Sequence, residues 1–467
     1  MSQALIEVNP PVFLPARASP NYSGAVQAVG ERRATASLKV FWALCVITMV
    51  MSHYAIAARL NIPYKAITVL VVLAAPLTTG FASLFSKKAV LWLLVYEAVL
   101  IIGCLISYTG NPSDLYNVHS APVVMIRVFP FMLCGYTLAQ FARNEKKWLL
   151  GLLVMFALVT LPDAIIFARG SLQGLQRDRL LTSNFDFEAA NAILSGYLNL
   201  TVCCLILAVI ANRLRDLVSR GLKWLITLCQ LTLASVCMTA GFTAAALLLF
   251  LSILLLGLLA PVRTLRFRVV TMALGFAAVT LAWVALGALA GGTGGTVRQI
   301  YSRLEGLRTT VVTGEVTKAT SKATSGRLDL GLISIRSFLN SPLIGMGKGK
   351  ESQTIAGHNS DTIGGHSYIL DSLGQRGLLG TFPVLAALGS LLLTAYRNFR
   401  RSPGSWRGSA MLAVMPMWIV AMIINPYFLG YLALNCVIFF SFGLILGDSD
   451  RLNSALGSLR FAGTGVR

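Results

Sequence analysis

Long apolar runs separated by short polar segments dominate the sequence after residue 39. Most of these runs contain about 17–25 residues, which is long enough for a helix to cross the ~30 Å hydrocarbon layer of a membrane. The pattern therefore predicts an all-α polytopic membrane protein with about twelve transmembrane helices. We place these helices near residues 40–58, 67–85, 89–107, 121–142, 148–168, 190–212, 222–240, 242–260, 267–290, 378–397, 408–424 and 428–447.

The spacing of the apolar runs also predicts how the chain is organised. The first segment is polar and rich in proline, and the first apolar run starts too late for a cleaved signal peptide. The longest interruption of the apolar pattern separates the ninth and tenth predicted spans. The expected units are a disordered cytoplasmic tail at 1–39, transmembrane helices 1–9 at 40–290, a large outer loop at 291–377, transmembrane helices 10–12 at 378–447 and a cytoplasmic tail at 448–467.

Composition and charge favour a membrane location. Hydrophobic residues make up 56% of the chain and charged residues only 12%, whereas charged residues are about a quarter of a soluble domain. The net charge of +21 is concentrated in alternate connections between apolar runs, as the positive-inside rule requires. We therefore expect a multi-pass membrane protein with both termini in the cytoplasm, and no nucleic-acid partner because long basic tracts are absent. The basic connections are 86–88, 143–147, 213–223, 263–268 and 397–407.

Sequence patterns for metal or cofactor binding are weak. The eight cysteines all lie in apolar runs, which predicts small buried side chains rather than a disulfide framework or a zinc site. Asp448 and Asp450 have the DxD spacing that metal-dependent glycosyltransferases use. They lie on the expected cytoplasmic side, away from the other candidates, so we interpret them as a polar helix end. We expect neither a metal ion nor a cofactor.

The large loop contains one predicted helix. Within residues 327–340, Leu328, Leu332, Ile335 and Leu339 recur at helical spacing, which predicts an amphipathic helix. The Asn-Ser-Pro sequence that follows is expected to end it.

Charged residues within the predicted spans are costly unless they are paired or hydrated. Arg127 lies in the fourth predicted span, Glu97 lies in the middle of the third, and Asp163 lies near the outer end of the fifth. One interpretation is that Arg127 faces an outward cavity and grips an anionic group. The other is an arginine–carboxylate pair that only fastens helices together. The two are compatible, because a carboxylate can orient an arginine toward a phosphate.

Arginines on the expected outer side depart from the positive-inside trend. Arg179 closes a group of three arginines in the second outer loop, and Arg327 and Arg336 flank the amphipathic helix. A planar guanidinium suits phosphate because it donates two parallel hydrogen bonds. Arg327 and Arg336 would lie on roughly opposite faces of a helix, so one is expected to face a cavity and the other solvent. Solvated loop charge is the alternative for Arg179.

The glycine-rich segment 357–380 carries the sharpest candidate for catalysis. His366 follows two glycines in a polar loop, and a neutral imidazole is a workable general base. A hydrogen-bonded structural histidine is the alternative. His358 is a weaker candidate, and Asp371 lies too far round a helix to be assumed a partner of His366.

These segments resemble the signature of the O-antigen polymerase and ligase superfamily, which contains Wzy-type polymerases and WaaL-type ligases. The resemblance lies in an arginine that opens a helix at Arg327 (SGRLDLGLISIRSF), a Pro-Leu-x-Gly-x-Gly turn at 341–349 (SPLIGMGKG), and a histidine before a glycine-rich helix at 366–380 (HSYILDSLGQRGLLG). Residues 179–200 resemble the outer-loop segment that precedes a span in this family. The expected topology, with one large outer loop before the last three spans, agrees with the family.

The resemblance implies a GT-C-like, metal-independent, inverting glycosyltransferase of the bacterial inner membrane that takes glycans from undecaprenyl diphosphate at the periplasmic face. It also implies that the loop at 291–377 is periplasmic and catalytic. Carried over by position, His366 is the catalytic base that deprotonates the acceptor hydroxyl. Arg327 holds the diphosphate, and Arg179 and Arg127 are further diphosphate-binding residues. The supporting positions are Ser367, Asp371, Arg336 and His358.

Polymerase, ligase and transporter all remain open as functions. Many ligases have Ser-Arg where this chain has Gly241 and Phe242, and His-Asn where it has His366 and Ser367. These differences favour a polymerase of lipid-linked repeat units over a ligase that acts on lipid A core. A lipid-linked glycan transporter would predict paired broken helices, and a RodA-type transferase would need an aspartate in place of His366. The expected partners are an undecaprenyl-diphosphate-linked oligosaccharide, membrane lipid and a chain-length regulator.

Overall fold

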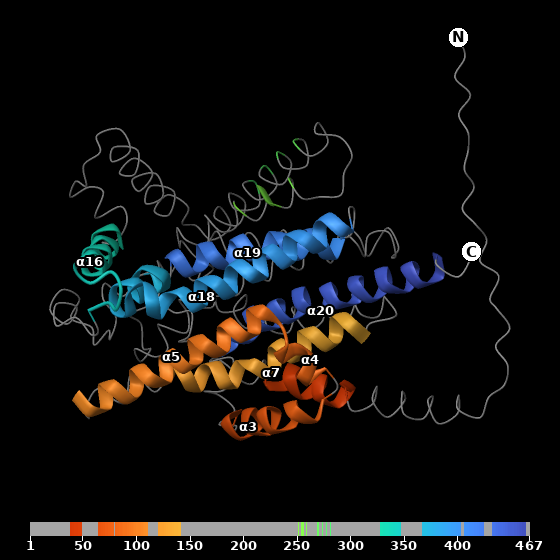
Figure 1. Cartoon of the computed structure of the whole chain (residues 1–467), viewed down its shortest axis with the longest axis horizontal. Coiled ribbons are helices and arrows are strands. Elements are labelled where there is room, and N and C mark those ends of the chain that lie inside the picture. Colours follow the sequence, from red (N-terminus) through yellow and green to blue (C-terminus); the bar gives the residue numbers. More distant parts are fainter. Residues whose placement is uncertain are drawn as a thin grey trace, which may run out of the picture.

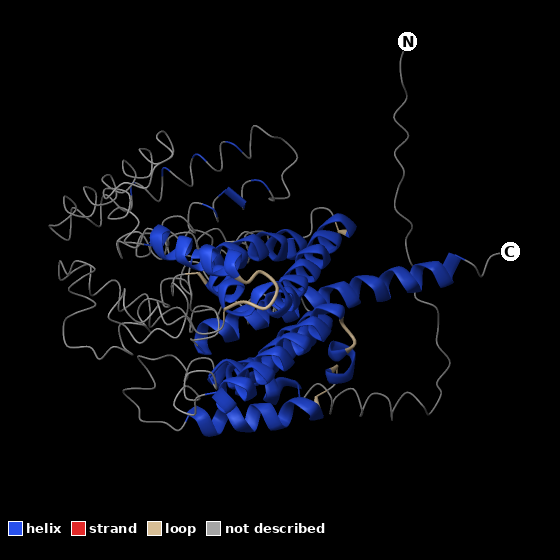
Figure 2. Ribbon diagram, turned by 60° about the vertical axis from the view of Figure 1, so that its left-hand side comes forward, coloured by secondary structure: helices blue, strands red, loops and turns tan. Residues whose placement is uncertain are grey.

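The described part of the chain is helical. The computed structural model describes residues 38–48, 64–78, 80–110, 120–141, 327–346, 367–402, 406–424 and 432–463, together with isolated positions between 251 and 281. Every regular element within these residues is a helix, as Figure 2 shows, which confirms the predicted all-α class. Of the described helices, Tyr368–Arg401 is long and apolar enough to cross a membrane, judged by length and composition.

The elements that follow the described helix at 38–48 are short. They are α3 (Tyr64–Ala74), the 3-10 helix η1 (Ala75–Leu77) and α4 (Phe81–Phe85). The expected continuous helix over 67–85 is therefore wrong. Pro76 stands in the first turn of η1, where it removes an amide donor and disfavours helical geometry at the residue before it. Gly80 then adopts a left-handed φ of 96° before α4 begins.

Long helices form the body of the described part. They are α5 (Lys88–Gly110), α7 (Ser120–Phe141), α18 (Tyr368–Arg401), α19 (Trp406–Ile424) and α20 (Leu432–Gly463). Helix α20 packs along α7, and α18 lies against both α5 and α19 (Figure 1). The bounds of α5, α7 and α19 confirm the helices expected at 89–107, 121–142 and 408–424, whereas α20 continues past the expected span end at 447.

Glycines allow α7 and α20 to approach backbone to backbone. A Cβ added at Gly443 would lie 1.9 Å from the carbonyl oxygen of Met132, and one added at Gly135 would lie 2.1 Å from that of Phe440. Gly447, one turn beyond Gly443, is equally crowded. Small residues at this spacing are a common way to bring two apolar helices together. The close contact is surrounded by the fully buried rings of Phe131, Tyr136, Phe439, Phe440 and Phe442.

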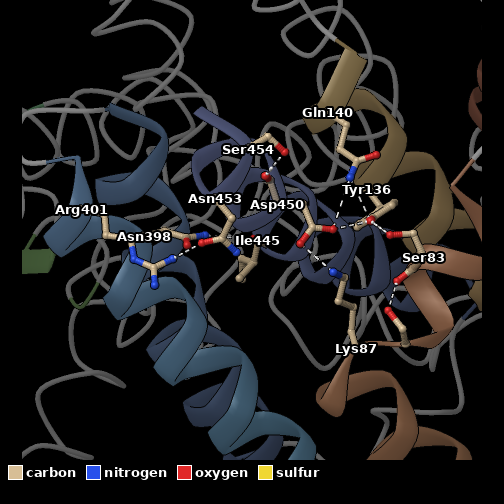
Figure 3. Close-up of polar contacts among 11 residues, drawn as sticks. Ser83, Lys87, Tyr136, Gln140, Asn398, Arg401, Ile445, Asp450, Asn453 and Ser454 are labelled. Carbon is tan, nitrogen blue, oxygen red and sulfur yellow. Dashed lines mark hydrogen bonds and ion pairs between the residues drawn. The ribbon is translucent and has the colours of Figure 1, made fainter. Parts of the chain in front are cut away.

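Two of the basic connections meet at one end of the helices. Lys87, just before α5, forms a 2.6 Å ion pair with Asp450 of α20. Arg401, the last residue of α18, donates a 2.7 Å hydrogen bond to Asn453 of α20 (Figure 3). Connections 86–88 and 397–407 therefore reach the same end of the described helices, as expected from their shared charge.

Candidate functional site

Helix α16 (Arg327–Asn340) confirms the predicted helix and its bounds. Of the apolar face expected on this helix, Leu332 is half-buried, whereas Ile335 is 39% exposed and Leu339 is 67% exposed. Ser334 is completely buried instead, and α16 packs against α18. The contact with α18 is thus made beside a polar residue that apolar periodicity did not identify.

The start of α18 is stabilised by reciprocal capping. Ser367 is the N-cap, and its Oγ accepts a 3.2 Å hydrogen bond from the amide of Leu370. In return, Oδ2 of Asp371 accepts a 3.1 Å hydrogen bond from the amide of Ser367. This arrangement satisfies amides that a helix start leaves without partners. It also places a negative charge at the positive end of the helix dipole.

Asp371 connects this helix start to α16. Oγ of Ser334 donates a 2.5 Å hydrogen bond to Oδ1 of Asp371. Asp371 is only 3% exposed, so its carboxylate depends on such donors to offset the loss of water. The two helices are therefore joined by a buried, charge-assisted hydrogen bond.

Helix α18 is broken at Gly377, which has φ 63° and ψ −166°. The segment after α16 fills the break. The amide of Leu378 donates to the carbonyl of Pro342 at 2.8 Å, and the amide of Leu379 donates to that of Leu343 at 3.0 Å. The loop thus caps the second part of α18, which starts where the span at 378 was expected. Helix α18 itself begins earlier, at Tyr368.

Glycine is required on both sides of this contact. Gly345 has φ 74°, and a Cβ there would lie 2.3 Å from the carbonyl carbon of Gln375. A Cβ at Gly377 would meet backbone at 2.4 Å. The amide of Met346 completes the contact by donating a 2.9 Å hydrogen bond to the carbonyl of Gly374. The turn and the helix break therefore fit together only without side chains at these two positions.

The structure describes several of the other expected site residues. Arg127 is half-buried on α7, Arg336 is exposed on α16, and Arg327 is the first residue of α16. Both carboxylate oxygens of Glu97 are buried and have no hydrogen-bond partner among the described residues. Glu97 and Arg127 are therefore not paired with each other, and Asp163, the other carboxylate of that interpretation, lies outside the described residues. The expected site residues His366, His358 and Arg179 lie outside the described residues.

The DxD aspartates are engaged by other side chains. Oδ2 of Asp450 accepts hydrogen bonds from the Tyr136 hydroxyl at 2.5 Å and from Gln140 at 3.3 Å, in addition to the Lys87 ion pair (Figure 3). Asp448 pairs with Arg451 at 3.1 Å. The described residues contain no group of three or more potential metal ligands. The expected helix end at these aspartates is wrong, because α20 continues to Gly463 and both residues lie within it. The described cysteines Cys45, Cys134 and Cys436 are buried free thiols, as expected.

No protein-family model matches the chain, and no curated protein matches it with significant sequence similarity. The resemblance to the polymerase and ligase superfamily therefore rests on the sequence alone, chiefly on the segments that start at Arg327, Ser341 and His366. Those segments are joined in the fold: residues 327–340 bond to the start of α18 through Ser334, and residues 341–346 bond to its break. We call residues 327–346 and 367–380 the motif unit.

Proposed function

We propose that the protein is a polysaccharide polymerase that joins undecaprenyl-diphosphate-linked repeat units at the periplasmic side of the inner membrane. The observation that carries the proposal is the motif unit. An arginine-led helix, a glycine turn and a helix that starts directly after a histidine resemble one family signature, and hydrogen bonds join them in space. A catalytic site shared among these segments would need such a connection.

In the proposed reaction, His366 takes the proton from the acceptor hydroxyl. The oxygen then forms a bond to the anomeric carbon of the donor glycan, while the bond from that carbon to the diphosphate oxygen breaks. Undecaprenyl diphosphate leaves with the bonding electrons, and Arg327 stabilises its charge, assisted by Arg179 and Arg127. Attack from the face opposite the leaving group inverts the anomeric configuration, and no metal ion is required.

The proposed orientation in the membrane follows from α18. This helix has 34 residues and runs from the motif unit, which includes its N-cap Ser367, to Arg401. Arg401 lies where connections 86–88 and 397–407 meet, and we call this end of the described helices the basic end. The motif unit and the basic connections therefore lie at opposite ends of a helix that is long enough to span the bilayer. Placing the basic end in the cytoplasm puts the motif unit at the periplasmic side. The remaining spans of a GT-C-like, twelve-helix arrangement are part of this proposal.

The break in α18 favours an enzyme over a transporter. Transporters use broken helices to offer backbone amides and carbonyls to their cargo. Here the amides of Leu378 and Leu379 and the carbonyl of Gly374 are bonded to the chain's own loop. The break thus serves to hold the glycine turn. A ligase would share the chemistry of the polymerase and differ in its acceptor.

The test is the glycolipid pattern of a strain that lacks this protein. Loss of a polymerase leaves single repeat units attached to their acceptor, whereas loss of a ligase leaves long chains on the undecaprenyl carrier. Complementation with His366→Ala should fail to restore long chains at normal protein level and membrane insertion. His119→Ala, which removes a histidine that has no role in the proposed site, is the matched control and should restore them. Long chains of normal length from His366→Ala would refute the proposed role of this histidine.

A further inference from the structure

Tyr96 of α5 is the centre of a buried polar cluster at the start of α18. Its side chain is fully buried, and its hydroxyl shares a hydrogen bond with the hydroxyl of Tyr368. Nη1 of Arg376 donates to the same Tyr96 oxygen at 3.1 Å and to Oγ of Ser372 at 3.2 Å. Two residues of α18, Tyr368 and Arg376, thus bond to one residue of α5, and Ser372 joins the cluster through Arg376.

The three residues of α18 form a polar stripe. Tyr368, Ser372 and Arg376 are spaced four residues apart, so they follow one face of the helix. Asp371 lies on a neighbouring face and bonds to Ser334 of α16. The first part of α18 is therefore held by polar bonds from two different helices.

Because α18 is broken at Gly377, the orientation of the part before the break depends on these bonds. Residues 368–376 precede the non-helical Gly377, so the helix backbone does not continue unbroken from them into the apolar part of α18. Hydrogen bonds are directional, and a buried network favours one orientation where purely apolar packing would tolerate several. Together with the bond from the amide of Met346 to the carbonyl of Gly374, the bonds to α5 and α16 consequently set how residues 368–376 are oriented.

We infer that Tyr96 is a positioning residue of the proposed transferase. It holds residues 368–376 through Tyr368 and Arg376, and thereby fixes the backbone of Ser367, which directly follows His366 in the chain. Tyr96 itself contributes no group to the substrate. The inference rests on the proposed function for its kinetic consequence, but the structural coupling between Tyr96 and residues 368–376 can be measured separately.

The experiment compares full-length wild-type protein with Tyr96→Phe and Tyr136→Phe in lipid nanodiscs. Tyr136 is the matched control because it is also fully buried and its hydroxyl bonds to Asp450, at the basic end. The probe is the undecaprenyl-diphosphate-linked repeat unit from a strain that lacks the protein. Hydrogen-exchange mass spectrometry follows the amides of residues 368–376, with residues 384–395 as internal reference.

For Tyr96→Phe we expect kcat to fall by about tenfold or more with KM nearly unchanged, because the reacting groups are misplaced while substrate still binds. Exchange should accelerate at residues 368–376 and remain unchanged at the reference. Tyr136→Phe should leave both quantities near wild type. Unchanged exchange at residues 368–376, or an unchanged kcat, would overturn the inference. If wild-type protein shows no turnover, the proposed function falls together with the kinetic role, while the exchange result still decides whether Tyr96 holds the segment.

Discussion

Ser334 of α16 donates a 2.5 Å hydrogen bond to the carboxylate of Asp371 in α18, and both side chains are buried. These residues come from two segments that flank the glycine turn in the sequence. The same carboxylate also accepts the amide of Ser367. Asp371 therefore connects the arginine-led helix to the backbone that follows His366, although its position in the sequence predicted no such role.

Ser334→Ala should lower the free energy of unfolding by about 1–3 kcal/mol, because the buried carboxylate of Asp371 loses a donor. Ser337→Ala is the control, since Ser337 is only half-buried on the same helix and should change stability by no more than about 0.5 kcal/mol. Thermal unfolding of the detergent-solubilised variants measures both. Equal effects of the two substitutions would mean that the bond to Asp371 contributes little.

Gly377→Ala should lower the free energy of unfolding by about 1–3 kcal/mol, because the positive φ of this position is unfavourable for a residue with a Cβ. Its Cβ would in addition meet the backbone of the glycine turn at 2.4 Å. Gly389→Ala, in the same helix, has nothing within 4 Å of the added Cβ and should be neutral or stabilising by up to about 1 kcal/mol. Unfolding midpoints of the two variants measure the difference, and a tolerated Gly377→Ala would contradict the described break.

Gly443→Ala should force α7 and α20 apart, because the new methyl group would overlap the carbonyl of Met132. Overpacking of this kind typically costs about 1–3 kcal/mol. Gly103→Ala on α5 has open space around the added Cβ and serves as the control. Size-exclusion profiles after a heating series report the fraction of each variant that stays folded. A profile of Gly443→Ala that matches Gly103→Ala would rule out the close helix contact.

Asp450→Asn should lower the free energy of unfolding by about 1–2 kcal/mol, because the ion pair with Lys87 is lost. The loss is modest since this pair is partly exposed and therefore partly screened by solvent. Turnover per folded molecule should stay the same and should be insensitive to EDTA, because this aspartate binds side chains rather than a metal ion. The exposed Arg401 bond can be removed by Asn453→Ala as a control, with an effect below about 0.5 kcal/mol. Loss of turnover both with EDTA and in Asp450→Asn would restore the DxD interpretation.

Much of the local structure could be predicted from the sequence. Apolar runs and helical spacing gave the bounds of α5, α7, α16 and α19 within a few residues. The grouping of Lys87 and Arg401 at one end was expected from charge alone. These predictions succeeded because hydropathy and periodicity depend on residues that are close together in the chain. The span expected at 67–85 failed because Pro76 and Gly80 outweigh the apolar pattern.

The connections between helices were decided by the tertiary structure. The sequence alone determined that this is a strongly apolar chain, and it predicted helices for the part that the structure describes. It did not indicate that Ser334 would be buried against Asp371, that a turn would fill the break at Gly377, or that Tyr96 would meet Arg376. Each of these contacts joins residues far apart in the chain, and their pairing depends on how whole helices pack, which no local pattern encodes.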